Sequence, residues 1–261
     1  HREQLPRLKR SVPVEDVRAL AGMAPPALDF AAALSEPGVS LIAECKKASP
    51  SRGLMVRDYD AAQLAQAYVR AGASAISVLT DARHFQGSLD DLREVKEVLQ
   101  TLKGPETGRP VPVLRKDFIF DPYQIYEARA AGADAVLLIA RVLGQNDLRS
   151  LLQLTHELGM EALVEVHSED ELEKVLALDP RVIGVNNRNL QTFEVDFDIT
   201  ARLRQQIPEP VVTVAESGIK GPEDVRRMAE IGVDAMLVGE SLVRSKDVLA
   251  AARRLVEAGR S

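Results

Sequence analysis

The sequence predicts an α/β protein, a single (β/α)8 TIM barrel with an N-terminal helical extension. Short apolar runs rich in β-branched residues recur eight times, and amphipathic stretches with helical spacing lie between them. Near-continuous apolar runs are typical of strands buried on both faces, as in parallel sheets. The chain has 261 residues, which one barrel domain accommodates. An open doubly wound sheet is the alternative, but its G-x-G-x-x-G dinucleotide motif is absent.

The strands and helices follow in alternation along the chain. The predicted strands are 41–43, 75–79, 111–114, 135–139, 162–164, 182–185, 211–214 and 235–238. The predicted helices with clear spacing are 61–70, 90–99, 123–130, 147–158, 169–178 and 222–230. Glycines that mark helix ends follow four of them, at Gly72, Gly132, Gly159 and Gly232. The alternation therefore predicts a parallel barrel with an outer ring of helices.

Residues 1–40 do not fit this alternation. They contain five prolines and two short helical stretches, at 14–20 and 29–34. Forty residues make a poor core of their own. We therefore expect residues 1–40 to be an extension packed on the barrel, and residues 41–261 to form the catalytic barrel. The chain begins with His1 rather than Met, so we expect its natural start to lie upstream.

Composition and charge exclude several classes of protein. The net charge is −6 without a long basic block, which disfavours a nucleic-acid partner. No apolar run approaches the roughly 20 residues of a membrane span, and the first residues show no charged and apolar pattern of a leader, so we do not expect secretion. Cys45 is the single cysteine, and the four histidines lack metal-ligand spacing, so neither a metal nor an iron–sulfur cofactor is expected. We expect a cytoplasmic protein. The sequence leaves the oligomeric state open and is compatible with a monomer.

Charged residues stand at the carboxyl ends of several predicted strands, where such barrels carry their active sites. Strand alternation puts Glu44 and Lys46 on one face and Cys45 on the other. If that face and those of Lys116 and Glu165 point inward, two lysines and two carboxylates meet at the mouth. A rim of exposed ion pairs is the alternative. Glu165 argues for chemistry, because it is flanked by apolar residues that make an unpaired charge costly.

Two further signals concern the loops of the barrel mouth. Ser217 and Gly218 follow the seventh strand, and Gly239 and Glu240 follow the eighth. Backbone N–H groups and helix starts in these two loops often bind phosphate in barrels, although ordinary turn glycines are the alternative. Ser217 lacks the G-x-S-x-G motif of a hydrolase nucleophile. The basic loop 46–55 is typical of a lid that closes on an anion, or of an ordinary solvated loop.

Apolar side chains near the strand ends suggest a pocket for an apolar group. They would wall an aromatic or aliphatic part of a substrate, or simply belong to the core. These residues are Phe85, Phe118, Leu137, Leu190 and Leu237.

The strand-end motifs, in order, closely resemble those of the indole-3-glycerol phosphate synthase family. They are 42–53, 85–89, 114–119, 163–166, 184–190 and 214–219, and the likeness covers roughly residues 28–245. The resemblance implies a carboxy-lyase of tryptophan biosynthesis. Its phosphosugar substrate is 1-(2-carboxyphenylamino)-1-deoxyribulose 5-phosphate, and its products are indole-3-glycerol phosphate, CO2 and water. The family uses no cofactor or metal.

The resemblance also implies roles for individual residues. Lys116 would be the general acid for ring closure, and Glu165 the base for dehydration. Lys46 would hold the anthranilate carboxylate and is a second candidate for an acid. Glu44 and Glu216 would orient the lysines and the ribulose hydroxyls. The remaining substrate contacts would come from Asn186 and Arg188 on the sugar phosphate, from Phe85, Phe118, Leu137, Leu190 and Leu237 on the aromatic ring, and from Ser49, Ser217, Gly218, Gly239 and the Glu240 amide on the phosphate.

The sequence departs from the family at three places, and two other functions stay open. Family members usually carry a further N-terminal helix, Cys45 replaces an aliphatic residue or Tyr, and Glu240 replaces the Ser of some members. One alternative is a barrel like phosphoribosylanthranilate isomerase, which uses a Cys base and an Asp acid. The other is a barrel that binds phosphosugars without turnover. Lys116 and Glu165 favour the synthase over both.

Overall fold

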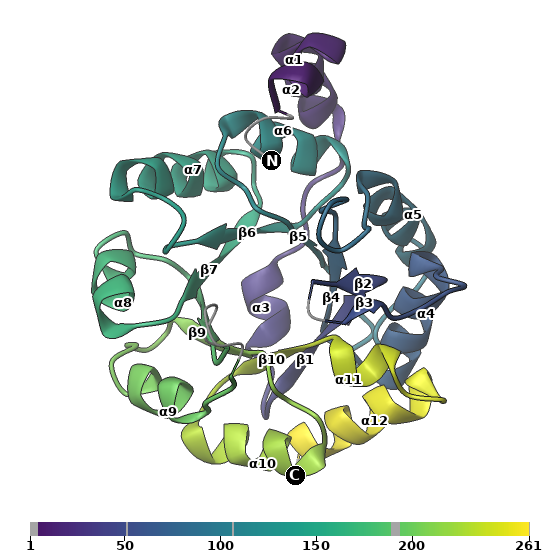
Figure 1. Cartoon of the computed structure of the whole chain (residues 1–261), viewed down its shortest axis with the longest axis vertical. Helices are drawn as coiled ribbons and strands as arrows, with labels where there is room; N and C mark the ends of the chain where they lie inside the picture. The colour runs from purple at the N-terminus through teal and green to yellow at the C-terminus, as the bar shows by residue number, and fades with distance from the viewer. Residues whose placement is uncertain (1–4, 51, 106, 189–193, 261) are drawn as a thin grey trace.

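The computed structural model describes residues 5–50, 52–105, 107–188 and 194–260. Eight parallel strands of this described chain close into a barrel inside a ring of helices (Figure 1). This confirms the predicted fold class. In chain order the barrel strands are β1 (Ser40–Cys45), β4 (Ala75–Leu79), β5 (Val113–Lys116), β6 (Ala135–Ile139), β7 (Glu161–Val166), β8 (Val182–Asn186), β9 (Val212–Glu216) and β10 (Ala235–Val238). A small antiparallel pair, β2 (Ala48–Ser49) and β3 (Gly53–Leu54), follows β1.

The outer helices agree closely with the sequence pattern. The six predicted ones are α4 (Ala61–Ala71), α5 (Leu89–Leu99), α6 (Pro122–Ala130), α7 (Gln145–Glu157), α8 (Glu169–Leu176) and α10 (Pro222–Ile231). Three more were not predicted, namely α9 (Asp198–Arg204), α11 (Glu240–Val243) and α12 (Val248–Gly259). Side chains of Asp60, Ser88, Asp121, Ser168 and Asp247 each accept a backbone N–H at a helix start, which satisfies a donor that the helix leaves free.

Two apolar layers surround the barrel wall. The inner layer fills the barrel and includes Ile42, Leu114 and Leu163, whereas the outer layer lies between strands and helices. Cys45 belongs to the outer layer, with Sγ 3.7 Å from the carbonyl oxygen of Ala61. Strand alternation thus turns Cys45 away from the barrel axis, as predicted. Within the described ranges, no helix has both the length and the apolar character needed to cross a bilayer.

The N-terminal segment forms three helices, α1 (Leu5–Ser11), α2 (Val14–Met23) and α3 (Phe30–Leu34). Figure 1 shows α1 and α2 outside the barrel beside α6, and α3 across the centre of the ring. Asp29 caps α3 by accepting the N–H of Ala32. Phe30 and Leu34 are fully buried in the inner layer, so α3 plugs the barrel at the end where its strands begin.

Phe30→Ala should lower the free energy of unfolding by about 3–5 kcal/mol, because it leaves a cavity that the rigid barrel cannot collapse around. Denaturant titration measures the loss. Met23→Ala, at a side chain that is 80% exposed in the same segment, should change the free energy of unfolding by less than about 0.5 kcal/mol. Equal effects of the two changes would mean that α3 does not close the barrel core.

Candidate active site

Five charged side chains gather at the mouth of the barrel. Lys46 Nζ lies 2.6 Å from Oε1 of Glu44, and Lys116 Nζ lies 3.2 Å from Oε2 of Glu216 and 3.9 Å from Oε2 of Glu44. Glu165 adds a third carboxylate, and all three glutamates are at most 3% exposed. A rim of exposed ion pairs is therefore the wrong description of this cluster.

Strand alternation explains why these groups point inward. Glu44 follows Ile42 by two positions, and Glu165 follows Leu163 by two, while both apolar residues lie in the inner layer. Gly184 makes room for the cluster on the neighbouring strand. A Cβ atom at Gly184 would stand 2.2 Å from Oε1 of Glu216, closer than such contacts allow. The sequence motif contained this glycine, but its role depends on the register between β8 and β9.

The cluster consists of three carboxylates and two lysines, so it carries one negative charge in excess when every group is ionised. Burial makes this excess charge unfavourable. Burial raises the pKa of Glu216 strongly, Lys116 opposes the rise and Glu165 adds to it. Burial also works against the charge on Lys116, but Glu216, Glu44 and Glu165 together raise the pKa of Lys116 above its ordinary value. The pKa of Glu44 is lowered, since its two lysines outweigh its burial. One proton therefore neutralises the excess negative charge, and near neutral pH it resides on Glu216, while Lys116 stays charged.

Glu216→Gln should make the protein more stable than the wild type at pH 8, by an amount that grows from pH 5. The pKa of Glu216 is about 8 in the folded protein against 4.5 ordinarily. Between these values the folded state keeps a proton that the unfolded chain has released, so stability falls as pH rises, by at most about 1.4 kcal/mol per pH unit. Denaturant titrations of both proteins across this pH range test it. A pH-independent difference would contradict the assignment of the proton to Glu216.

The apolar wall predicted from sequence lies around the same mouth. Leu137 and Leu237 are buried in the inner layer, and Phe118 packs against it. Phe85 is half-buried, with Lys46 Nζ 6.0 Å from its ring centroid. Phe85 thus lies beside Lys46, and Phe118 follows Lys116 by two positions and packs against the inner layer. Leu190 lies outside the described residues.

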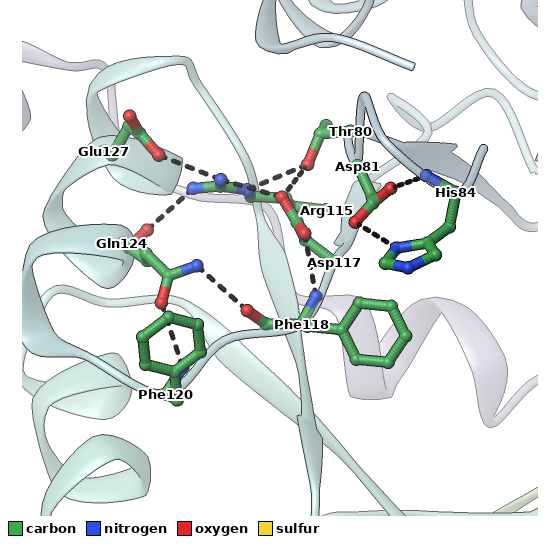
Figure 2. Close-up of polar contacts among 9 residues, drawn as sticks. All are labelled: Thr80, Asp81, His84, Arg115, Asp117, Phe118, Phe120, Gln124 and Glu127. Carbon is green, nitrogen blue, oxygen red and sulfur yellow. Dashed lines mark hydrogen bonds and ion pairs between the residues drawn. The ribbon is translucent and has the colours of Figure 1, made fainter. Parts of the chain in front are cut away.

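A buried polar network behind β5 fixes the chain that carries Lys116 and Phe118 (Figure 2). The Arg115 guanidinium donates to Thr80 Oγ1, the Gln124 carbonyl and Asp117 Oδ2, and pairs with Glu127 at 2.9 Å. Asp117 Oδ1 accepts the Phe118 N–H at 2.8 Å. The network therefore ties the ends of β4 and β5 to α6 and leaves that turn little freedom.

The sequence analysis did not select Arg115 or Asp117 as functional residues. They alternate with Lys116, so they face the helix layer and not the mouth. The sequence did offer a signal for these two residues. A short apolar strand with charged residues on both faces must bury one set of them under a helix, and here Arg115 and Asp117 are buried under α6. Asn187 was missed in the same way. It is fully buried, donates to the Glu216 carbonyl and accepts from Thr200, and it thus holds β8 against β9.

Four of the five predicted phosphate residues follow β9 or β10, and the fifth, Ser49, lies in β2. Ser217 and Gly218 have positive φ angles of 68° and 90°, which turns the backbone sharply after β9. A Cβ at Gly239 would stand 2.4 Å from Oε1 of Glu44, so the loop passes directly over the cluster. Ser49 Oγ is buried and, within the described chain, has no hydrogen-bond partner. Such a hydroxyl fits a site that a ligand oxygen would complete.

Two further residues complete the description of this end of the site. Arg52, which follows β2, lies with Nε 3.3 Å from Oε1 of Glu240 and links the loop after β1 to α11. The sequence analysis included Arg52 in a lid-like loop but did not select it.

Asn186 is buried at the end of β8, and its Oδ1 accepts the N–H of Arg188 at 3.0 Å. In the described part of the chain, no three His, Cys, Asp or Glu side chains converge as a metal site would require.

The fold and the site together define a (β/α)8-barrel enzyme with paired lysines and carboxylates at its mouth, beside loops suited to an anion. The family model of indole-3-glycerol phosphate synthase matches residues 1–255. The chain belongs to the indole-3-glycerol phosphate synthase family. This confirms the family, the class of enzyme and the pathway, tryptophan biosynthesis, that the strand-end motifs implied.

Individual relatives agree with this assignment over most of their length. An indole-3-glycerol phosphate synthase of Dehalococcoides mccartyi is 48% identical over 253 residues, 97% of this chain and 95% of the relative. One of Mycobacterium sp. (strain KMS) is 51% identical over 248 residues, 95% of this chain and 88% of the relative. Among solved structures, KGPDC from Streptococcus mutans has a TM-score of 0.64 at 9% identity, covering 84% of this chain and 96% of that one. The last similarity supports the barrel fold.

Proposed function

We propose that this protein carries out the synthase reaction at the described mouth, with Lys116 and Glu165 as its acid and base. The substrate is 1-(2-carboxyphenylamino)-1-deoxyribulose 5-phosphate, which loses CO2 and water to give indole-3-glycerol phosphate. The observation that carries the proposal is the buried cluster in which Lys116 faces carboxylates from three other strands. Family membership supports the same reaction.

Ring closure needs a proton at the C2′ carbonyl oxygen of the substrate, because the attacking aromatic ring pushes electrons onto that atom. Lys116 is kept charged by its carboxylate neighbours and projects from the end of β5. The alkoxide that would otherwise form is a stronger base than an amine, so proton transfer from Lys116 is favourable. A positioned acid of this kind contributes about 10²–10⁴-fold to the rate.

Dehydration needs a base, and Glu165 provides it from β7. Loss of CO2 leaves a ring that becomes aromatic when a proton and a hydroxyl group depart. Glu165 takes the proton, and Lys46, which holds the anthranilate carboxylate before CO2 leaves, is the candidate acid that protonates the departing hydroxyl so that it leaves as water. Glu44 anchors Lys46 at 2.6 Å, which fixes the ammonium within the mouth. Glu216 orients Lys116 and the sugar hydroxyls.

The remaining residues of the site would contact three parts of the substrate: its aromatic ring, its sugar chain and its phosphate. Phe85, Phe118, Leu137 and Leu237 would wall the aromatic ring, Asn186 would hold the sugar chain, and Arg188 would approach the phosphate. The phosphate would rest on Ser49, Ser217, Gly218, Gly239 and the Glu240 amide. Glu240 contributes its backbone only, since its carboxylate would repel the phosphate and is paired with Arg52.

We propose a single catalytic domain, residues 41–261, with residues 1–40 as its extension. The burial of α3 in the inner layer supports this division, because α3 and the barrel share one core. A monomer in the cytoplasm is the state that we propose for the protein. The small-molecule phosphosugar needs no nucleic-acid or membrane partner.

Turnover of the purified protein tests the proposal. Indole fluorescence should rise when the carboxyphenylamino-deoxyribulose phosphate is added, and one CO2 should appear per indole. Product binding without turnover would support the phosphosugar-binding barrel instead. Isomerisation of phosphoribosylanthranilate would support the other alternative, although Cys45 lies in the outer layer and cannot serve as a base at the mouth.

A further inference from the structure

A histidine that the reaction scheme leaves unused lies directly behind Glu165. His167 follows β7, and its side chain is 3% exposed. Its Nε2 atom lies 3.4 Å from Oε1 of Glu165 and makes no hydrogen bond within the described residues. A small movement of the Glu165 carboxylate would close this distance to a hydrogen bond. An imidazole with one nitrogen aimed at the base of the reaction is therefore built into the site.

The other ring nitrogen is fixed by the start of α8. Glu171 Oε2 accepts the backbone N–H of His167 at 2.7 Å and lies 3.3 Å from Nδ1 of the ring. Ser168 caps the same helix by accepting the N–H of Glu171, in a Ser-x-x-Glu pattern that places this glutamate beside the preceding chain. Arg141 Nε donates to Glu171 Oε1 at 2.8 Å. The residues therefore form a line from Arg141 at the surface through Glu171 and His167 to Glu165.

The tautomer of the ring follows from this line. Burial works to raise the pKa of Glu171, but hydrogen bonds from His167 and Arg141 lower it to about 2. Glu171 is therefore ionised and accepts hydrogen bonds only, so Nδ1 of His167 carries a hydrogen. Nε2 is then the nitrogen that can gain or lose a proton, and it faces Glu165. The titratable groups around the pair are Glu171 and Arg141 on one side, and Lys116, Glu216 and Glu44 across the mouth.

We propose that His167 is a positioning residue for Glu165, which holds the carboxylate through Nε2 and shares one proton with it. When Glu165 is ionised, Nε2–H donates to it. When the ring is neutral instead, Nε2 carries no hydrogen before the reaction, and the proton that Glu165 takes from the substrate becomes the Glu165 O–H that donates to Nε2. In both cases one proton joins the two groups, and the carboxylate keeps one orientation. The inference rests on the proposed role of Glu165 as the base of dehydration.

Kinetics of His167 variants test the proposal. His167→Asn keeps a group near Glu171 but removes Nε2, so kcat should fall about tenfold or more while KM changes little. His167→Gln places an amide N–H near the position of Nε2 and should restore part of kcat. Neither variant can exchange a proton at this position, so the pH dependence that His167 contributes to kcat should vanish in both.

His156→Asn is the matched control for these variants. His156 Nε2 pairs with Oε1 of Glu161 at 3.1 Å, and Glu161 begins the same strand at the opposite end of the barrel. This change should leave kcat and its pH profile as in the wild type. If His167→Asn matches His156→Asn in both readouts, the proposal is wrong.

A measurement on the ring itself covers the case in which a variant of His167 does not fold. With ¹⁵N-labelled histidine, NMR of the intact protein should show Nδ1 of His167 protonated throughout and Nε2 as the titrating atom. Glu165→Gln should shift that titration to lower pH and leave the titration of His156 unchanged. Titration of Nδ1, or an unchanged midpoint, would overturn the proposal. If Glu165→Gln shifts the titration of His167 but the wild type forms no indole, the proposed function is wrong, whereas the pairing of His167 with Glu165 is supported.

Discussion

Lys116→Met should reduce kcat for indole formation by about 10³-fold and prevent CO2 release as well. The expected loss follows from the role of Lys116 as acid in ring closure, the step before decarboxylation, and from the 10²–10⁴-fold that positioned acids contribute. Methionine fills a similar volume without a charge. Steady-state indole fluorescence and trapped CO2 measure the two products. The binding of indole-3-glycerol phosphate should persist, because the phosphate loops are unchanged.

Lys96→Met is the matched control for this variant. Lys96 Nζ also pairs with a buried carboxylate, at 2.6 Å from Oδ2 of Asp134, but it lies on α5 away from the mouth. Its loss should lower stability and leave kcat close to that of the wild type. A similar fall in kcat for both variants would mean that loss of a lysine ion pair, and not the missing acid, slows the reaction.

Glu165→Gln should lower kcat for indole formation by about 10²–10⁴-fold, because the amide cannot take the proton that dehydration releases. Ring closure and decarboxylation do not need this base, so CO2 should still form in a first turnover. Glu161→Gln changes a residue that is 4% exposed on the same strand, at the end away from the mouth, and should leave kcat unchanged. Equal losses of CO2 and indole in Glu165→Gln would place this carboxylate in the first step instead.

The barrel itself could be predicted from the sequence because its signals are local. Eight apolar runs and the glycines after the helices predicted the strands, and six helices agreed with the structure to within two residues at each end. The short helices α9 and α11 were missed because seven and four residues carry too little periodicity. The plug formed by Phe30 was missed since burial at the barrel axis is a property of the closed sheet, which no local pattern reveals.

The candidate site was predictable where it depends on local sequence patterns, and it was not predictable where it depends on how the strands come together. Alternation along each strand correctly separated Glu44 from Cys45, because side-chain direction is set within two residues. Contacts between strands were not predictable. The space that Gly184 leaves for Glu216, the approach of His167 to Glu165 and the Arg115 network all depend on register or on a helix docking from elsewhere. The residue roles assigned to the mouth stay predictions until the variants are measured.

A single-turnover experiment tests most directly whether Lys116 is the acid of ring closure and Glu165 the base of dehydration. Excess enzyme is mixed with carboxyl-labelled substrate, and CO2 and indole are followed separately in the wild type, Lys116→Met and Glu165→Gln. We predict that the wild type forms both, that Lys116→Met forms neither, and that Glu165→Gln releases one CO2 per site while indole lags far behind. If Glu165→Gln loses CO2 release and Lys116→Met retains it, the assigned roles of the acid and the base are wrong.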